Sequence, residues 1–340
     1  MTVTVQSEAA KTDAMLSLAA LLKGAGVIAL DDVGWIRATG SDRVRWLNGM
    51  VTNAIQELKP GAGNYNFLLN AQGRIQADAT VFAEADALLL ETAAASVPDV
   101  MKMLDHYIIM DDVELSDTTA ERAGLLVAGP QAAAVLEAIG LTTVGIEQLA
   151  RKSAVWHGSE VIVLQAYSPL VPRFELWAAA ATCSALQDAM SAAGAVICEP
   201  RSLEWLRILE GVPRYGVDIR ERELPQETAQ DRALHFAKGC YLGQEIVERI
   251  RSRGNVHRTF SGFRLDGVLP DAGVALLAEG KPVGELTSVA AVPLPGDLNT
   301  TVQLALGYVR REALERSVPL VYEGGVAIPV SLPFKVAPAN

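Results

Sequence analysis

The chain has 340 residues, 50% of them hydrophobic and 20% charged, which is typical of a globular protein with two or three domains. Its formal net charge of -11 argues against broad binding to nucleic acid or to an anionic membrane, since both need a basic surface. Three cysteines without CxxC spacing and four scattered histidines predict no disulfide framework and no metal site.

The N-terminal residues 1–15 show neither a secretory signal nor an Arg-rich transit peptide, and no uninterrupted apolar run reaches the roughly 20 residues that span a membrane. We therefore expect a reduced, cytoplasmic protein. Residues 34–55 then predict a strand, a turn and a helix, with Ser41 as N-cap. Three apolar residues follow at helical spacing, namely Val44, Leu47 and Val51.

Residues 64–92 predict a β-meander, because "NAQG" and "EADA" interrupt three strand-like runs. Alternation in the second run puts Ile75, Ala77, Ala79 and Val81 on one face and Gln76, Asp78 and Thr80 on the other. Asp78 is therefore expected on a polar face that points away from the local core.

Strands and helices continue to alternate up to residue 198. The predicted order is a helix and a strand in 97–117, a strand and a helix in 124–140, strands in 159–179, and a helix ending at Gly194 before another strand. From residue 258 short alternating runs separated by Gly, Pro and Asp predict an antiparallel β-barrel. The fold class is α+β, with two interleaved ferredoxin-like α/β subdomains over 25–257 and the barrel over 258–335.

The segment "AKGCYLGQEIVERIRSRG", residues 237–254, has the most distinctive composition. Helical spacing runs from Leu242 to Arg253, with Gly254 as the stop. The helix would carry an apolar stripe of Ile246, Val247 and Ile250, and an exposed face of Glu245, Arg249 and Arg253 at i,i+4 spacing.

Cys240 falls just before the predicted helix, where the helix dipole and the positive charge of Lys238 would favour a thiolate. Gly239 and Gly243 would let a ligand or another chain approach the backbone closely. The alternative from the residues alone is that Cys240 is a small buried hydrophobe and that the Glu/Arg face is only solvated surface.

The octapeptide "KGCYLGQE", followed by Arg249 and by Arg253-Gly254, resembles the signature of the YgfZ family. These folate-binding proteins support assembly or repair of iron–sulfur clusters and are related to the glycine-cleavage aminomethyltransferase. The resemblance implies that Lys238, Gly239, Cys240, Gly243, Gln244 and Glu245 form the functional motif. Further family-like segments are "TGSDRVRWLNGMVTNAIQELKPG", "GRIQADATVF", "DHYIIMDDVEL", "LRILEGVPRYGVDI", "LPQETAQ" and "ALGYVRR…LPF".

The resemblance also implies two α/β domains and a barrel arranged around a central folate channel. Asp78 matches the transferase's catalytic aspartate, although "GRIQAD" has Ala77 where the transferase has a first acid, and Glu175 matches its pterin-binding glutamate. Other implied cofactor contacts are Arg207, Tyr215, Gly239, Gly243, Gln244, Glu245, Arg249 and Arg253. The cofactor would be tetrahydrofolate or a one-carbon derivative.

Alternatives stay open for the matched pocket residues. Asp78 could be a solvated strand residue and Glu175 an edge-strand charge, Arg207 could pair with Glu204 or Glu210 across one helical turn, and Tyr215 could lie in the core. The transferase's glycine-rich approach to its glutamate is absent here, where "SPLVPRFELW" replaces it. The transferase also lacks the Lys-Gly-Cys-Tyr segment.

Three functions compete. The first is a tetrahydrofolate-binding factor that meets iron–sulfur enzymes or assembly proteins transiently, as a monomer, with Cys240 in thiol chemistry or partner contact. The three dispersed cysteines argue against a stable cluster of its own. The second is a folate-dependent aminomethyl or one-carbon transferase in which Asp78 acts electrostatically or as a general base. The third is an interaction protein with a relict pocket.

Overall fold

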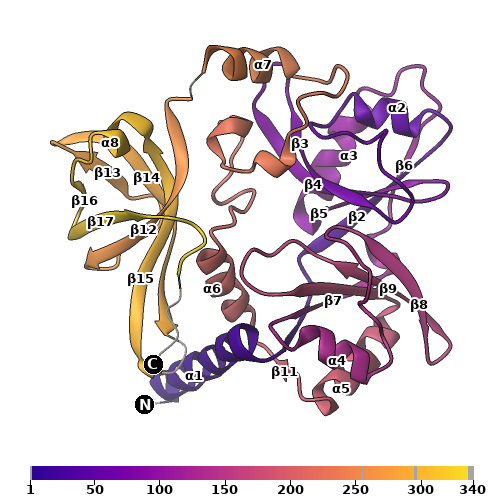
Figure 1. The fold of residues 1–340 in the computed structure, drawn as a ribbon, viewed down its shortest axis with the longest axis horizontal. Helices are drawn as coiled ribbons and strands as arrows, with labels where there is room; N and C mark the ends of the chain where they lie inside the picture. The colour runs from indigo at the N-terminus through magenta and orange to yellow at the C-terminus, as the bar shows by residue number, and fades with distance from the viewer. Residues whose placement is uncertain (1, 255, 295–296, 336–340) are drawn as a thin grey trace. The chain divides into compact units, whose positions relative to one another are not determined.

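The computed structural model describes residues 2–254, 256–294 and 297–335, with the side chains of residues 2–11, 253 and 297–299 left aside (Figure 1). The chain divides into two compact units. The two-sheet unit comprises residues 23–197 and 231–246, and the barrel unit comprises 1–22, 198–230 and 247–340. The domains predicted from the sequence were 25–257 and 258–335, whereas the barrel unit also contains 198–230 and 247–257.

The two-sheet unit contains a six-stranded sheet of order β11-β1-β7-β10-β9-β8 and a five-stranded sheet of order β3-β4-β5-β2-β6. The first sheet is formed by β1 (Gly26–Ala29), β7 (Ala123–Ala128), β8 (Arg151–Trp156), β9 (Ser159–Gln165), β10 (Arg173–Ala178) and β11 (Val196–Ile197). The second is formed by β2 (Val33–Thr39), β3 (Gly63–Leu69), β4 (Ile75–Ala83), β5 (Leu88–Ala93) and β6 (Glu114–Asp117).

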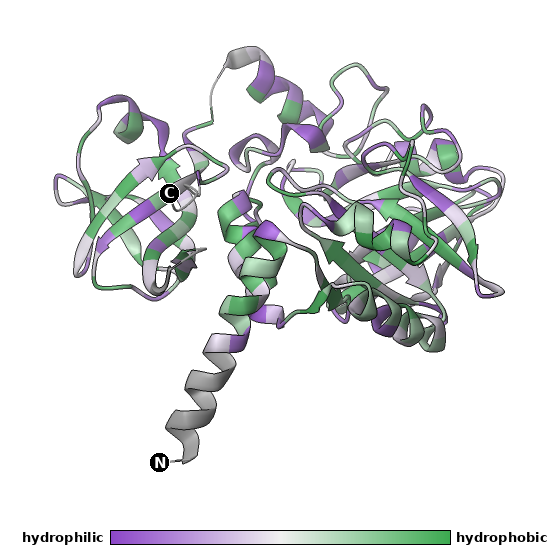
Figure 2. Ribbon diagram, turned by 60° about the horizontal axis from the view of Figure 1, so that its bottom comes forward, coloured by the Kyte–Doolittle hydropathy of each residue, from purple (hydrophilic) through white to green (hydrophobic). Residues whose placement is uncertain are grey.

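Helices cover one face of each sheet. They are α2 (Arg43–Asn48), α3 (Val97–Asp105), α4 (Ala132–Ala138) and α5 (Ala180–Ala192), with short 3-10 turns η1 (Ala94–Ser96), η2 (Thr119–Glu121) and η4 (Asp231–Ala233). Residues of α4 and α5 pack on the six-stranded sheet, and residues of α2 and α3 pack on the five-stranded sheet. Hydrophobic residues are concentrated on the strands of this unit (Figure 2).

The faces of the two sheets that carry no helices meet in a small aromatic cluster. Trp35 and Phe82 of the five-stranded sheet contact Trp177 of the other sheet edge to face, with ring centroids 5.7 and 5.3 Å apart. Edge-to-face geometry suits the quadrupoles of aromatic rings. The two-sheet unit is therefore layered as helices, sheet, sheet and helices.

The predicted elements of the two-sheet unit are confirmed in type and order, including the β-meander. In β4, Ile75, Ala77, Ala79 and Val81 are buried and the intervening residues are half-buried, as the alternation predicts. The predicted N-cap was wrong. Asp42 precedes α2, and the Ser41 backbone N–H donates to the Asp112 carboxylate instead, at 2.9 Å.

The barrel unit holds a closed barrel of order β12-β15-β14-β13-β16-β17 in its described part, which confirms the predicted fold class. Its strands are β12 (Arg258–Gly267), β13 (Ala275–Ala278), β14 (Lys281–Leu294), β15 (Asp297–Arg310), β16 (Leu320–Tyr322) and β17 (Gly325–Val330). Its helices are α1 (Thr2–Lys23), α6 (Pro200–Glu210), η3 (Pro225–Glu227) and α8 (Arg311–Glu315), while α7 (Gln244–Arg253) begins in the two-sheet unit and continues into this one.

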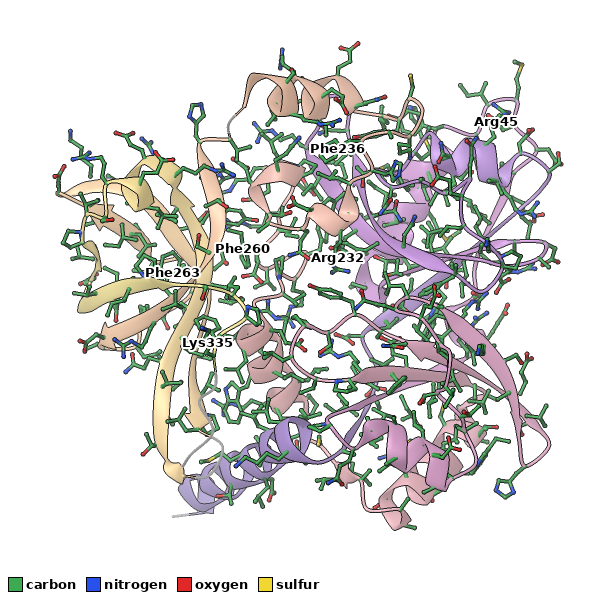
Figure 3. The ribbon with its side chains drawn as sticks, viewed as in Figure 1. Arg45, Arg232, Phe236, Phe260, Phe263 and Lys335 are labelled. Carbon is green, nitrogen blue, oxygen red and sulfur yellow. The ribbon has the colours of Figure 1, made fainter. Side chains whose placement is uncertain are left out.

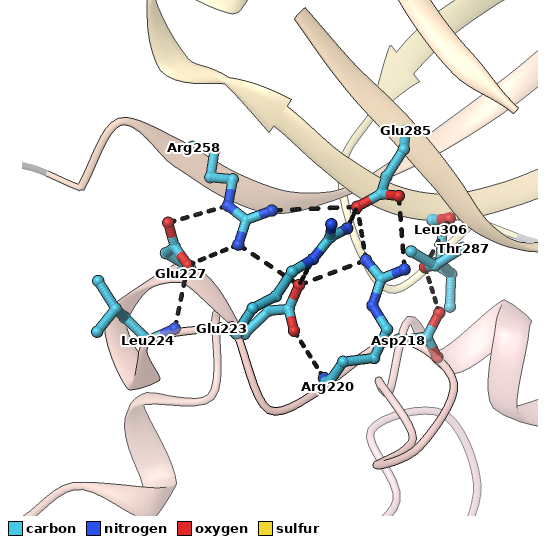
Figure 4. A network of polar contacts seen from close by, with 10 residues as sticks. Asp218, Arg220, Glu223, Leu224, Glu227, Arg258, Glu285, Thr287 and Leu306 are labelled. Carbon is cyan, nitrogen blue, oxygen red and sulfur yellow. Dashed lines mark hydrogen bonds and ion pairs between the residues drawn. The ribbon is translucent and has the colours of Figure 1, made fainter. Parts of the chain in front are cut away.

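A network of arginines and carboxylates fastens the loop around residues 218–227 to barrel strands of the same unit (Figure 4). Arg258 of β12 donates to the buried Glu227 at 3.0 Å. Arg220 and Arg222 both contact Glu285 of β14. Glu227 lies in the segment "LPQETAQ", which is part of the family resemblance, and its structural role is this pairing with Arg258.

Among the described residues, no helix is both long enough and apolar enough to cross a lipid bilayer.

Candidate functional site

One row of side chains crosses the five-stranded sheet on the face that looks toward the other sheet. Register places Tyr65 of β3 opposite Thr80 of β4, Thr80 opposite Glu91 of β5, and Glu91 opposite Trp35 of β2. Asp78 lies two residues before Thr80 and so shares this face. Polar groups from three neighbouring strands are thus gathered in one place.

Asp78 is half-buried on this face and is not the solvated strand residue of the alternative interpretation. The Tyr65 hydroxyl donates a hydrogen bond of 2.7 Å to its Oδ2 atom. Burial raises the pKa of Asp78, while the Tyr65 hydrogen bond and the charge of Arg232 oppose that rise. The carboxylate can accept further hydrogen bonds, but its burial makes the ionised form less favourable.

Arg232 provides the cation of the site and was not among the residues predicted from the sequence. Its guanidinium lies 4.0 Å from the ring centroid of Tyr65 and 3.9 Å from that of Tyr167. Burial lowers the pKa of Arg232, and the neighbouring Tyr65, Tyr167 and Asp78 partly compensate. Figure 3 shows Arg232 and Phe236 on the segment between α6 and α7. Aromatic rings, a flat cation and a carboxylate together suit a planar heterocycle that carries N–H donors.

Glu175 lies on β10, in the centre of the six-stranded sheet, and is not at an edge. The strand pairs with β7 on one side and with β9 on the other. Its carboxylate is buried and accepts a hydrogen bond of 3.1 Å from Trp177 Nε1. Burial raises the pKa of Glu175. Asp78 and Glu175 both belong to the two-sheet unit, on the faces that look toward each other.

The motif segment is attached to residues 48–53 of the same unit. The ammonium group of Lys238 donates to the carbonyl oxygens of Asn48, Val51 and Asn53 at 2.6–2.7 Å. Three such bonds use all three donors of a lysine. Lys238 therefore organises this loop, and the predicted effect of its charge on the Cys240 thiol stays a prediction. Burial lowers the pKa of Lys238 to about 7.

Cys240 is the exposed cysteine of the chain, whereas Cys183 and Cys198 are buried. The buried-hydrophobe alternative is therefore wrong for Cys240. It lies between two fixed points, because Lys238 holds the 48–53 loop and the Leu242 backbone N–H donates to Gly49 at 3.0 Å. The thiol is thus presented to solvent from an anchored loop. The helix begins at Gln244, two residues later than predicted, so Cys240 precedes its first turn by four positions.

The two motif glycines differ in what they contact. Gly243 has φ +81°, and a Cβ atom there would lie 2.5 Å from the carbonyl oxygen of Asn70 in the turn between β3 and β4. The close approach expected at this position is therefore made by the protein's own backbone. Gly239 has nothing within 4 Å of a hypothetical Cβ, and its φ is not positive.

This difference makes a matched pair of variants. Gly243→Ala is expected to lower the free energy of unfolding by at least about 2 kcal/mol, from left-handed strain and the clash with Asn70. Gly239→Ala is expected to change it by less than about 0.5 kcal/mol. Urea denaturation followed by circular dichroism measures both. Equal losses in the two variants would show that the docking of Gly243 on the Asn70 turn is not what stabilises this loop.

The remaining motif residues have different surroundings. Gln244 Oε1 accepts a hydrogen bond of 3.2 Å from the Tyr241 backbone N–H, so this side chain braces the loop that carries Cys240. Glu245 and Arg249 are exposed on α7, as the helical spacing predicts. The side chain of Arg253 lies outside the described part of the structure. The cofactor contacts expected of these residues stay predictions.

Arg207 and Tyr215 belong to the barrel unit. The guanidinium of Arg207 donates to both carboxylate oxygens of Glu204, to Asp218, to Ser288 and to the Val212 carbonyl. These contacts use its five donors, so the helical-turn pairing with Glu204 is confirmed and no donor remains for a cofactor. Tyr215 is half-buried and lines a shallow pocket with Arg220 and Arg222, so it is not a core residue.

In the part of the chain that the structure describes, no group of three or more His, Cys, Asp or Glu side chains is arranged to hold a metal ion.

The family described as GCVT N-terminal domain matches residues 8–238, which is more than half of the chain. The chain belongs to this GCVT family. The match ends at Lys238, so the family assignment covers Asp78, Glu175 and Arg232 but not Cys240.

Two curated relatives of this GCVT protein are aminomethyltransferases. That of Geobacillus kaustophilus is 28% identical over 315 residues, which cover 88% of this chain and 84% of the relative. That of Rippkaea orientalis is 26% identical over 334 residues, which cover 92% of this chain and 87% of the relative. The crystal structure of the glycine cleavage system aminomethyltransferase T from Bartonella henselae superposes with a TM-score of 0.83 at 21% identity, over 95% of this chain and 89% of that chain, and so shows a shared fold.

Proposed function

We propose that this GCVT-family protein binds tetrahydrofolate or a one-carbon derivative in its two-sheet unit and supports assembly or repair of iron–sulfur clusters in client enzymes. The observation that carries the binding part is the gathering of Asp78, Tyr65 and Arg232 on one face of the five-stranded sheet. A reduced pterin has adjacent N–H donors that a carboxylate accepts, and its flat ring suits the Arg232 and tyrosine surfaces.

The residues of the site and the motif would each have a role in binding the ligand or the partner. Asp78 accepts N–H groups of the ligand, and Tyr65 fixes the orientation of that carboxylate through its 2.7 Å hydrogen bond. Arg232, which lies against the rings of Tyr65 and Tyr167, would place a cation beside the ligand. The folate supplies one-carbon chemistry or acts as a bound effector. Cys240, exposed on its anchored loop, meets the partner protein.

The "KGCYLGQE" motif supports the iron–sulfur role, because an exposed thiol held between two backbone anchors is available to a partner. The partners we propose are iron–sulfur enzymes or assembly proteins, met transiently by a monomer in the cytoplasm. A resident cluster is not part of the proposal, since two of the three cysteines are buried.

The second candidate is a folate-dependent aminomethyltransferase, which the names of the relatives favour. In that reaction the aminomethyl carbon leaves a lipoyl sulfur for tetrahydrofolate, with release of ammonia and formation of methylene-tetrahydrofolate. Asp78 would then assist the folate nitrogen as a base or by its charge.

One assay separates the two candidates. The protein is mixed with aminomethylated lipoyl carrier protein and tetrahydrofolate, and methylene-tetrahydrofolate is measured over many equivalents of enzyme. We expect saturable tetrahydrofolate binding without sustained turnover. Turnover that survives Cys240→Ala and is lost in Asp78→Asn would establish the transferase and contradict the iron–sulfur role. An absence of saturable binding would leave an interaction protein with a relict pocket.

A further inference from the structure

Two glutamates, Glu91 half-buried and Glu175 buried, face each other between the sheets of the two-sheet unit. Glu91 lies opposite Trp35 across β5 and β2, and Glu175 precedes Trp177 by two residues on the same face of β10. The two indole rings are in contact, with centroids 5.7 Å apart. The contact of the tryptophans brings the acids beside them together, and the carboxyl groups of Glu91 and Glu175 lie close enough to share a hydrogen bond.

One oxygen atom of this pair lacks a hydrogen-bond donor. Glu91 Oε2 is buried and has no hydrogen-bond partner, and the same is true of Trp35 Nε1, which approaches the Glu91 carboxyl without reaching hydrogen-bond geometry. Glu175 Oε2 accepts from Trp177 Nε1. A buried acceptor without a donor costs free energy, so such an atom at a candidate site points to a missing N–H group.

Few opposite charges compensate the pair. The positive charge of Arg151 acts on Glu91, but Arg151 is paired with Glu84 at 2.6 Å. The charge of Arg173 lowers the pKa of Glu175, and that of Asp32 raises it. Asp78 lies on the same sheet face, diagonal to Glu91 across β4 and β5. With so little positive charge nearby, two ionised carboxylates would repel each other strongly.

We propose that Glu91 and Glu175 hold one proton between them and present their remaining acceptor oxygens to a pair of adjacent N–H groups on the ligand. In this arrangement Glu91 donates the shared proton from one oxygen to the Glu175 carboxylate, and its other oxygen accepts from the ligand. Glu91 is thus a binding residue that neither the motif nor the family match singles out.

The ligand chemistry that fits is an amidine-like edge, with an amino group beside a ring N–H, as on a pterin. This part of the inference rests on the proposed function. Asp78 and the carboxyl pair would each accept N–H groups of the same flat molecule, so a ligand that lacks either donor set should bind less tightly.

A ligand-free experiment tests the shared proton. Burial and Glu175 raise the pKa of Glu91 well above its ordinary value, so the folded protein holds a proton that the unfolded chain releases above about pH 4.3. The wild type should therefore lose stability, relative to Glu91→Gln, as pH rises from there toward the raised value. Glutamine keeps a donor for Glu175 and an acceptor for a ligand but cannot titrate. If the melting temperatures of wild type and Glu91→Gln change with pH in the same way across this range, the two carboxyl groups do not share a proton.

A binding experiment tests the role of Glu91 toward the ligand, with tetrahydrofolate titrated anaerobically. Glu91→Gln should keep the wild-type dissociation constant within about 3-fold at neutral pH, whereas Glu91→Leu, which has no acceptor, should raise it at least 10-fold. Unchanged binding by Glu91→Leu would overturn the ligand role. A wild type that binds no tetrahydrofolate would overturn the proposed function and this ligand role together, and would leave the melting experiment as the test of the pair.

Discussion

Replacing Asp78 by asparagine is expected to weaken tetrahydrofolate binding by about 100-fold, which corresponds to roughly 3 kcal/mol. The substitution keeps the size of the side chain but removes its charge, and it turns an NH₂ group toward ligand N–H donors. It also weakens the Tyr65 contact that orients the carboxylate. Isothermal titration calorimetry at pH 7 measures the difference directly.

The pH profile of binding gives this prediction a second readout. Burial raises the pKa of Asp78, so the accepting carboxylate becomes depleted as pH falls through that raised value. Wild-type affinity should therefore decline on the acid side, and the asparagine variant should lack this decline. Asp86→Asn is the matched control, because Asp86 lies in the turn after β4 with its side chain 80% exposed. If Asp78→Asn binds as tightly as Asp86→Asn, the polar sheet face is not the folate site.

Replacing Cys240 by alanine is expected to abolish rescue of iron–sulfur enzyme activity in cells that lack the protein, while the free energy of unfolding changes by less than about 0.5 kcal/mol. The thiol is exposed, so its removal leaves no cavity. Native protein treated with a thiol reagent should be modified at Cys240 well before Cys183 and Cys198, which are buried. Because Cys240 is exposed and the other two cysteines are buried, the reagent should modify Cys240 selectively.

Cys198→Ala is the control for this variant. It removes a buried sulfur that contacts the Ser17 carbonyl at 3.6 Å, so it should cost about 1 kcal/mol of stability and keep the rescue. Full rescue by Cys240→Ala would remove the thiol from the function. A large loss of stability in Cys240→Ala would instead show that the sulfur is part of the packing.

The sequence predicts the local features of the site well because they depend on periodicity. Alternation along β4 places Asp78 on the correct face, and turn residues at 70–73 and 84–87 delimit the meander. The barrel and the alternating α/β elements follow from the same patterns. What periodicity does not contain is which distant side chains meet.

The partners of the site residues illustrate this limit. Arg232 meets Tyr65 and Tyr167 from a different segment of the chain, and nothing in its local sequence marks it as a ligand-binding residue. The sequence places the charge of Lys238 near Cys240, but it does not show that three carbonyl groups from residues 48–53 hold the ammonium group. Alternation along β3 gives only the face of Tyr65, and its position opposite Thr80 is a matter of strand register.

The most direct test of the central claim is the crystal structure of a complex with tetrahydrofolate. The account predicts the pterin between the sheets of the two-sheet unit, with its N–H groups on Asp78 and on the Glu91–Glu175 pair and its ring against Arg232. A folate found only elsewhere, for example in the apolar pocket of about 440 Å³ lined by Leu209, Val292 and Phe334 in the barrel unit, would contradict it.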